Sequence, residues 1–239
     1  MPLRIDILTL FPEMFGPILG TSIPKRAAEK GLVEYVLTNL RDFATDSHQS
    51  VDDRPFGGGP GMVMMCPTMF DAVEAIEKAD PRTTTRILLS PQGSVLNQAL
   101  VEEFAARPRL LLMAGHYEGF DQRIIDGLNP LEVSIGDYVL SGVEVPAMAL
   151  IDAIVRVLPG VLGHEQGAVD ESFADGLLEH PQFTRPRDFR GMSVPPVLLS
   201  GNHEAIAQWR LEQRQLRTQK RRPDLWQHYQ AARSKMNDG

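Results

Sequence analysis

The chain has 239 residues, and 43% of them are hydrophobic, which is enough to bury a sizeable core. Its formal net charge of −7 argues against a protein whose whole surface is covered by nucleic acid. No run of residues approaches the roughly 20 apolar positions of a membrane helix, so we expect a globular protein of the cytoplasm. The single cysteine, Cys66, excludes an internal disulfide, and we interpret it as a small core residue.

Apolar, β-branched runs alternate with helical patterns over the first part of the chain. Strands are expected at 3–10, 86–90 and 109–114, and their continuous apolar character is typical of a parallel sheet. Each expected helix is followed closely by a glycine or a proline, and these helices cover 22–30, 68–79, 97–106 and 146–158. The alternation predicts an α/β fold with a mostly parallel sheet.

The remainder of the chain changes character after residue 162. Residues 163–175 are polar and lack periodicity, which is typical of a flexible linker. Proline-rich turns and two helical patterns, at 204–217 and 225–235, then predict a small helical domain. The expected division is therefore a domain over 1–162, a linker over 163–175 and a helical domain over 176–239.

One helical segment of this last domain is strongly basic. Between Trp209 and Arg222 a single acid, Glu212, stands against six basic residues, Arg210, Arg214, Arg217, Lys220, Arg221 and Arg222. Such a local excess suggests a polyanion that meets one face of the protein. A solvated helix face without a partner fits this segment equally well.

A glycine-rich loop reads Asp52-Asp53-Arg54-Pro55-Phe56-Gly57-Gly58-Gly59-Pro60-Gly61-Met62. Glycines allow backbone amides to approach a ligand closely. The loop lacks the Lys-Ser/Thr pair of a phosphate-binding P-loop and the glycine spacing of a dinucleotide fold. Taken alone, a structural loop is as good an interpretation as a binding loop.

Three further loops follow apolar runs, at 90–93, 115–119 and 134–142. In open α/β sheets ligands bind beyond the carboxyl ends of the strands, where at least two of these loops must lie. Glycine-containing turns after strands are common, so each loop alone is a weak signal. Their shared placement favours a single cofactor pocket.

At this point the sequence resembles a known family, the bacterial tRNA (guanine-N1)-methyltransferases of the knotted (SPOUT) methyltransferase superfamily. The resemblance covers nearly the whole chain. Besides the glycine-rich loop, it is carried by Leu10-Phe11-Pro12-Glu13-Met14-Phe15, Ser134-Ile135-Gly136-Asp137-Tyr138, Pro159-Gly160-Val161-Leu162-Gly163 and Leu198-Leu199-Ser200-Gly201-Asn202-His203.

This resemblance implies a deep trefoil knot toward the end of the first domain, which no periodicity reveals. It also implies that S-adenosylmethionine binds in the knot. The residues expected to bind it are Leu88, Leu89, Ser90, Pro91, Gly115, Tyr117, Glu118, Gly119, Ile135, Gly136, Asp137, Tyr138, Val139, Leu140, Gly142 and Pro146.

The family's substrate is tRNA with guanosine at position 37, just 3′ of the anticodon, and the product carries a methyl group on N1. The resemblance further implies a homodimer with sites at the subunit interface, and phosphate contacts by the basic segment. Family members use magnesium in catalysis. The sequence offers no oxygen-ligand cage for that ion, and its six histidines form no metal-ligand pattern.

Methylation at N1 requires a base that removes the N1 proton and a cation that stabilises charge on O6. Arg156 matches the family's active-site arginine, although without the resemblance we would interpret it as a residue that complements a helix dipole. Glu171 stands where the family has its aspartate base, and Asp170 is the substitute if the linker shifts by one residue. A solvated acidic linker is the alternative for both.

A second departure is Val143, which stands where the family has a glycine. A side chain there is expected to crowd the cofactor or to strain the turn. His116 occupies a position where the family has Arg or His, and we assign it no catalytic role. Two other functions stay open, namely a knotted RNA-binding protein that has lost its chemistry and a phosphotransferase that uses the glycine-rich loop.

Overall fold

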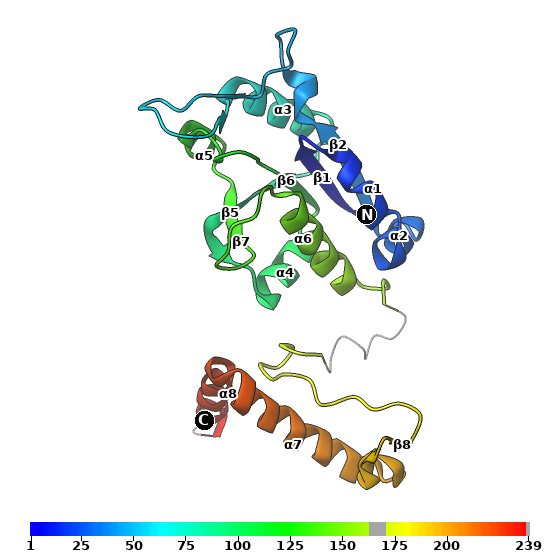
Figure 1. Cartoon of the computed structure of the whole chain (residues 1–239). Helices are drawn as coiled ribbons and strands as arrows, with labels where there is room; N and C mark the ends of the chain where they lie inside the picture. The colour runs from blue at the N-terminus through cyan, green and yellow to red at the C-terminus, as the bar shows by residue number, and fades with distance from the viewer. Residues whose placement is uncertain (163–170, 238–239) are drawn as a thin grey trace. The chain divides into compact units, whose positions relative to one another are not determined.

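The chain forms two compact units in the computed structural model, which describes residues 1–162 and 171–237. The first unit covers Met1–Gly163 and the second covers His164–Gly239. A parallel sheet lies in the first unit, and two long helices dominate the second (Figure 1). Within the described residues no helix is both long and apolar enough to span a membrane.

The sheet of the first unit has five strands, and all of its neighbouring strands are parallel. Their order in the sheet is β2-β1-β6-β5-β7. The bounds are β1 Leu3–Thr9, β2 Val33–Asn39, β5 Thr85–Val95, β6 Arg109–Met113 and β7 Leu131–Ser134. The predicted parallel strands at 3–10, 86–90 and 109–114 are confirmed, whereas β2 and β7 were not predicted.

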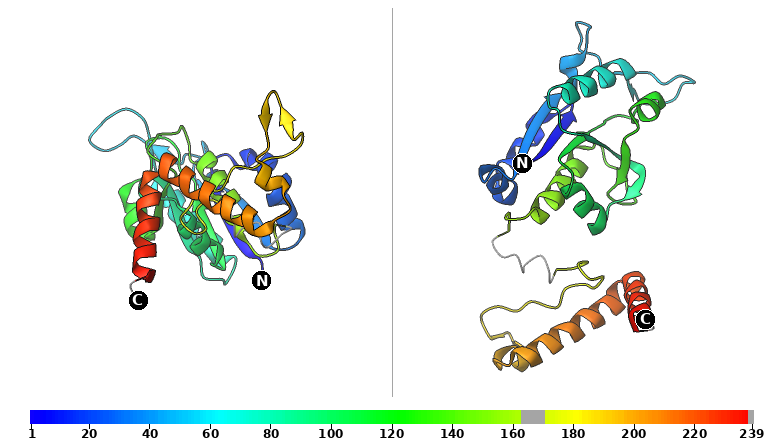
Figure 2. Two further views of the ribbon diagram at one scale, coloured as in Figure 1. Left: turned by 90° about the horizontal axis from the view of Figure 1, so that it is seen from below. Right: turned by 180° about the vertical axis from the view of Figure 1, so that it is seen from behind.

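Helices cover both faces of this sheet (Figure 2). Successive strand residues point to opposite faces, so Leu89 joins one buried cluster and Leu88 the other. Residues of α2 (Ser22–Glu29), α4 (Gln98–Ala105) and α6 (Glu144–Val157) complete the first cluster. Residues of α3 (Cys66–Lys78) and α5 (Gln122–Leu128) complete the second. The α/β prediction and its four helices in this unit are therefore confirmed.

Short elements connect these layers. They are η1 Pro12–Met14, α1 Gly16–Leu19, η2 Leu40–Phe43, and the antiparallel pair β3 Asp52–Asp53 and β4 Val63–Met64. The glycine-rich loop is the connection between β3 and β4. Cys66, in the first turn of α3, is only half-buried, and burial raises the pKa of its thiol.

A buried ion pair joins β1 to the first residue of β6. The Nε atom of Arg109 lies 2.6 Å from an Asp6 carboxylate oxygen, and both side chains are fully buried. The remaining guanidinium N–H groups donate to the carbonyl oxygens of Ile76, Glu77 and Asp80, and Arg4 also binds Asp6 at 2.8 Å. The pair is well compensated, because both charges have several hydrogen-bond partners.

The second unit is built on α7 (His203–Arg221) and α8 (Pro223–Asn237), which pack against each other. The Asn202 side chain accepts a hydrogen bond from the Ala205 amide and so caps α7. A small hairpin, β8 (Asp188–Phe189) with β9 (Met192–Ser193), and η4 (Pro196–Leu199) precede the helices. Both helices predicted for this region are confirmed.

The basic residues of α7 do not share one surface. Arg214 is buried and forms an ion pair with Asp175, so it belongs to the interior of the second unit. Arg217 is half-buried, while Arg210, Lys220 and Arg221 are exposed. The expectation that all six basic residues meet phosphates is therefore wrong for Arg214, because its guanidinium already holds the 171–180 segment against α7.

Candidate functional site

The three predicted loops meet at the carboxyl edge of the sheet. Strand β5 pairs with β7 both before and after the 90–93 loop, because Leu89 and Ser94 are both opposite Val133. The 115–119 loop follows β6, and the 134–142 loop follows β7, so the three loops belong to adjacent strands. Gly93 lies directly against the β7 backbone, where a Cβ atom would be 2.3 Å from the Val133 nitrogen. The turn therefore requires glycine at that position.

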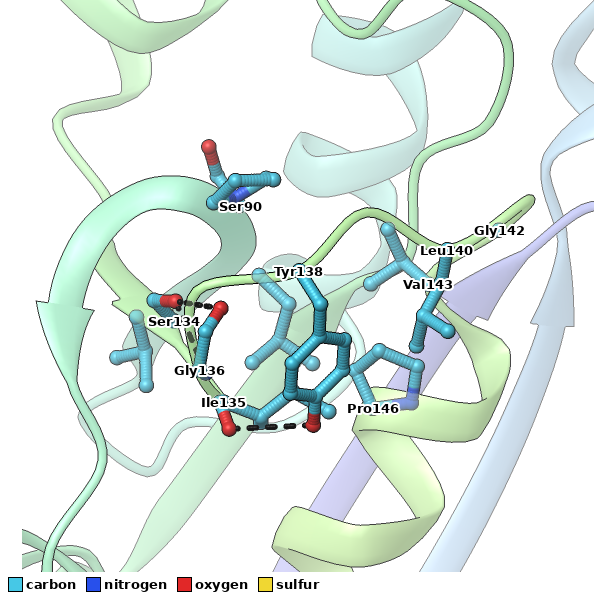
Figure 3. A pocket seen from close by; sticks show the side chains of 12 residues that line it. Ser90, Ser134, Ile135, Gly136, Tyr138, Leu140, Gly142, Val143 and Pro146 are labelled. Atoms are coloured by element: carbon cyan, nitrogen blue, oxygen red, sulfur yellow. Dashed lines mark hydrogen bonds between the residues drawn. The ribbon is translucent and has the colours of Figure 1, made fainter.

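Loops 90–93 and 134–142, with the first turn of α6, line a largely apolar pocket of about 60 Å³. The Tyr138 hydroxyl donates to the Ile135 carbonyl at 3.2 Å, and the Ser134 hydroxyl donates to the Gly136 carbonyl at 3.1 Å (Figure 3). These bonds shape the loop into one wall of the pocket. The lining residues are Leu89, Ser90, Pro91, Val133, Ser134, Ile135, Gly136, Tyr138, Leu140, Gly142, Val143 and Pro146.

A second, more polar pocket of about 320 Å³ adjoins the first and shares Leu89, Ser90, Pro91, Leu140, Gly142 and Val143 with it. It adds the whole 115–119 loop, including Tyr117 and Glu118. Together the two pockets bring together every residue predicted to bind a cofactor except Asp137, which is exposed and lines neither.

Several lining residues of these pockets are not among those predicted to bind the cofactor, although Ser134 and His116 lie in loops that the sequence indicated. Val133 and Ser134 end β7, a strand of only four residues that gives no clear apolar run. Glu132 and His116 also line the larger pocket. A correct prediction of β7 would have indicated the first two, since they stand at the carboxyl end of a strand.

The hairpin that carries the glycine-rich loop supports the 115–119 loop. The Glu118 amide donates to the Met62 carbonyl, and the Met64 amide donates to the Gly119 carbonyl, both at 2.9 Å. Gly61 packs so closely on the Glu118 side chain that a Cβ atom would lie 2.3 Å from it. Neither of the two pockets is lined by residues 57–61, and the close packing of Gly61 favours a structural interpretation of that glycine.

Val143 fits its backbone without strain. It is the N-cap of α6, with φ −96° and ψ −5°, which any L-residue adopts. The expectation of a strained turn is therefore wrong, and the side chain packs against the buried cluster beside α6. Because Val143 also lines both pockets, its effect on cofactor binding stays a prediction. Gly142 is the constrained position, since a Cβ atom there would lie 2.6 Å from Glu144 and 2.7 Å from His116.

The expected catalytic residues lie in different units. Arg156 is half-buried in the last turn of α6, in the first unit. Glu171 is half-buried at the start of the described part of the second unit, where its carbonyl accepts from the Ala174 amide at 3.4 Å. Asp170, the substitute base, lies outside the described residues. Within residues 1–162 and 171–237 no group of three His, Cys, Asp or Glu side chains is arranged to hold a metal ion.

The sequence is similar to known proteins over most of its length. The sequence model of the family described as tRNA (guanine-1)-methyltransferase TrmD matches residues 3–228. A Moorella thermoacetica protein named tRNA (guanine-N(1)-)-methyltransferase is 56% identical over 227 residues, which cover 93% of this chain and 90% of that protein. A protein of the same name from Geobacillus kaustophilus is 53% identical over 95% of this chain and 93% of its own length. Another from a Synechococcus species is 53% identical over 93% of this chain and 87% of its own length. The chain therefore belongs to the tRNA (guanine-1)-methyltransferase family.

Proposed function

We propose that this protein transfers the methyl group of S-adenosylmethionine to N1 of guanosine 37 in tRNA. The observation that carries the proposal is the pair of adjoining pockets, which gathers the predicted cofactor residues of three separate loops at the carboxyl edge of one sheet. The chain's match to its family over residues 3–228 supports the reaction type.

The residues present suit S-adenosylmethionine, which supplies the methyl group when it is bound. The smaller pocket has apolar walls from Leu89, Ile135 and Pro146, which suit the adenine ring. Backbone amides and carbonyls of the 134–142 loop are the groups that would read its polar edge. Glu118 and Tyr117 in the larger pocket provide polar groups for the charged remainder.

Two side chains are proposed to activate the guanine. Its N1 is a poor nucleophile while protonated, so Glu171 removes the N1 proton, with Asp170 as the alternative base. Arg156 stabilises the negative charge that develops on O6. No step is assigned to magnesium, because the described residues offer no cluster of ligands for it.

We propose the domain division 1–162, 163–175 and 176–239, with a deep trefoil knot in the first domain and a homodimer in the cytoplasm. Each site would combine the first unit of one subunit with the linker and helical domain of its partner. Exposed apolar side chains beside the pocket support such a partner, because Val139 is 83% and Val145 is 55% exposed. The exposed residues Arg210, Lys220 and Arg221 would meet tRNA phosphates.

The test is transfer of a labelled methyl group from S-adenosylmethionine to tRNA with guanosine at position 37, beside the same tRNA with adenosine there. We expect transfer to the guanosine tRNA alone, because only that base presents a removable N1 proton beside O6. Equal labelling of both tRNAs would contradict the proposed target. If the protein binds cofactor and tRNA but methylates neither tRNA, the result would favour the RNA-binding alternative. That alternative is suggested by Glu171, which stands where the family has an aspartate.

A further inference from the structure

Three side chains from separate elements meet behind the pocket wall at the carboxyl edge of the sheet. Glu144 is the first residue of α6, Thr9 is the last residue of β1, and His116 lies in the 115–119 loop. Glu144 and Thr9 are buried, and the Thr9 hydroxyl donates to a Glu144 carboxylate oxygen at 2.8 Å. The same hydroxyl oxygen accepts from the Phe11 amide at 3.0 Å.

The buried Glu144 carboxylate requires compensation for its lost hydration. Its position at the amino end of a 14-residue helix is favourable for a negative charge, and Thr9 adds one hydrogen bond. The nearest basic side chain is His116, whose Nδ1 atom lies 4.0 Å from the second carboxylate oxygen. This distance brings the two groups face to face without a hydrogen bond.

The hydrogen bonding of the His116 ring is also incomplete among the described residues. Its Nδ1 atom is buried and has no hydrogen-bond partner among the residues that the structure describes. The ring is held edge-on by Phe11 and Tyr117, with centroid distances of 5.3 and 5.2 Å. A buried nitrogen without a partner is costly, so this ring is poised to donate to the carboxylate that it faces.

Gly142 lies between the two groups and lines both pockets. A Cβ atom on Gly142 would be 2.6 Å from the Glu144 carboxylate and 2.7 Å from His116 Nδ1, so only glycine allows their approach. The Val143 amide also donates to the Gly115 carbonyl at 3.3 Å. The 115–119 and 134–142 loops are therefore linked beside the His116–Glu144 pair.

We propose that Glu144 is a positioning residue for the cofactor pocket, which acts by holding His116. Occupation of the pocket draws the two loops together over Gly142, and the 4.0 Å gap closes into a hydrogen bond from His116 to Glu144. Part of the binding energy for the cofactor depends on this bond. The inference rests on the proposed function, because it takes S-adenosylmethionine as the occupant.

The test is calorimetric titration of the full-length protein with S-adenosylmethionine. Glu144→Gln keeps an oxygen for the Thr9 hydroxyl but removes the charge, and we expect its Kd to rise about tenfold, as for one lost charge-assisted hydrogen bond. His116→Ala is expected to weaken binding similarly, and the double variant should be within about twofold of either single variant. His116→Asn retains an N–H donor at the Nδ1 position and should bind nearly as the wild type does.

The matched control is Glu103→Gln on α4, where the glutamate forms an exposed ion pair with Arg107, and its Kd should equal that of the wild type. Thermal unfolding of each variant shows that the change in binding is not a loss of folding. At saturating cofactor, kcat of the Glu144→Gln variant should stay within about twofold of the wild-type value, with the effect confined to KM.

Two outcomes would overturn the inference, namely wild-type affinity in folded Glu144→Gln protein, or losses that add in the double variant. A Kd of the His116→Asn variant as poor as that of His116→Ala would overturn it too. Absence of S-adenosylmethionine binding by the wild type would instead remove the proposed function, and this inference with it. If the wild type binds S-adenosylmethionine tightly and the variants do not behave as expected, the inference fails and the proposed function stands.

Discussion

Arg156→Ala and Glu171→Ala, each inactive as a purified protein, are expected to regain about a quarter of the wild-type activity when they are mixed in equal amounts. Each substitution alone should slow single-turnover methyl transfer about 10² to 10³-fold, because one removes the charge that stabilises O6 and the other the base. In a mixed dimer one site carries both substitutions, and the other site carries neither. Exchange of subunits is followed by labelled methyl transfer after incubation of the mixture.

The recovery depends on the two residues of a site coming from different subunits. If both came from one chain, every site in the mixture would lack one of them, and the mixture would stay inactive. Asp170→Ala is the matched control for the base, since it should retain activity when Glu171 is the base. Loss of activity in the Asp170→Ala variant with full activity in Glu171→Ala would transfer that role to Asp170.

The largest loss of stability is expected from Arg109→Met. This change removes the buried partner of Asp6 and frees three carbonyl oxygens that the guanidinium now binds. The free energy of unfolding should fall by about 3 to 5 kcal/mol, because a buried carboxylate is left with Arg4 alone. Urea unfolding followed by circular dichroism measures the change.

Arg107→Met, two residues earlier, is the matched control for this loss. Its guanidinium forms an exposed ion pair with Glu103, so the expected change is within about 0.5 kcal/mol. Equal losses of unfolding free energy in the two variants would show that the buried ion pair contributes no more to stability than the exposed one. An unchanged free energy of unfolding in the Arg109→Met variant would also contradict the view that Asp6 needs this partner.

The central part of the fold was predictable because burial on both faces leaves a clear pattern. Strands β1 and β6 are buried along nearly their whole length, and the sequence shows them as continuous apolar runs. Strand β2 is at the edge of the sheet and only its first residue, Val33, is buried, so its apolar run is limited to Tyr35-Val36-Leu37. The proposed knot follows from no local pattern, since a knot depends on how distant segments thread past one another.

The candidate site was predictable to the extent that loops after strands converge on one edge. The resemblance added the proposed ligand and the proposed role of Arg156. Rules based on residue type alone failed in two places. Val143 needs no glycine because its φ is −96°, and Arg214 is no surface charge because Asp175 pairs with it inside the second unit. Both outcomes depend on tertiary contacts that a sequence does not display.

The most direct test of the central claim is nucleoside analysis of tRNA after reaction with this protein and S-adenosylmethionine. The tRNA is digested, and the modified nucleoside is identified and located by mass spectrometry. The proposed reaction predicts 1-methylguanosine at position 37 and at no other position. A methyl group on another atom of guanine, on another nucleotide, or on none would contradict it.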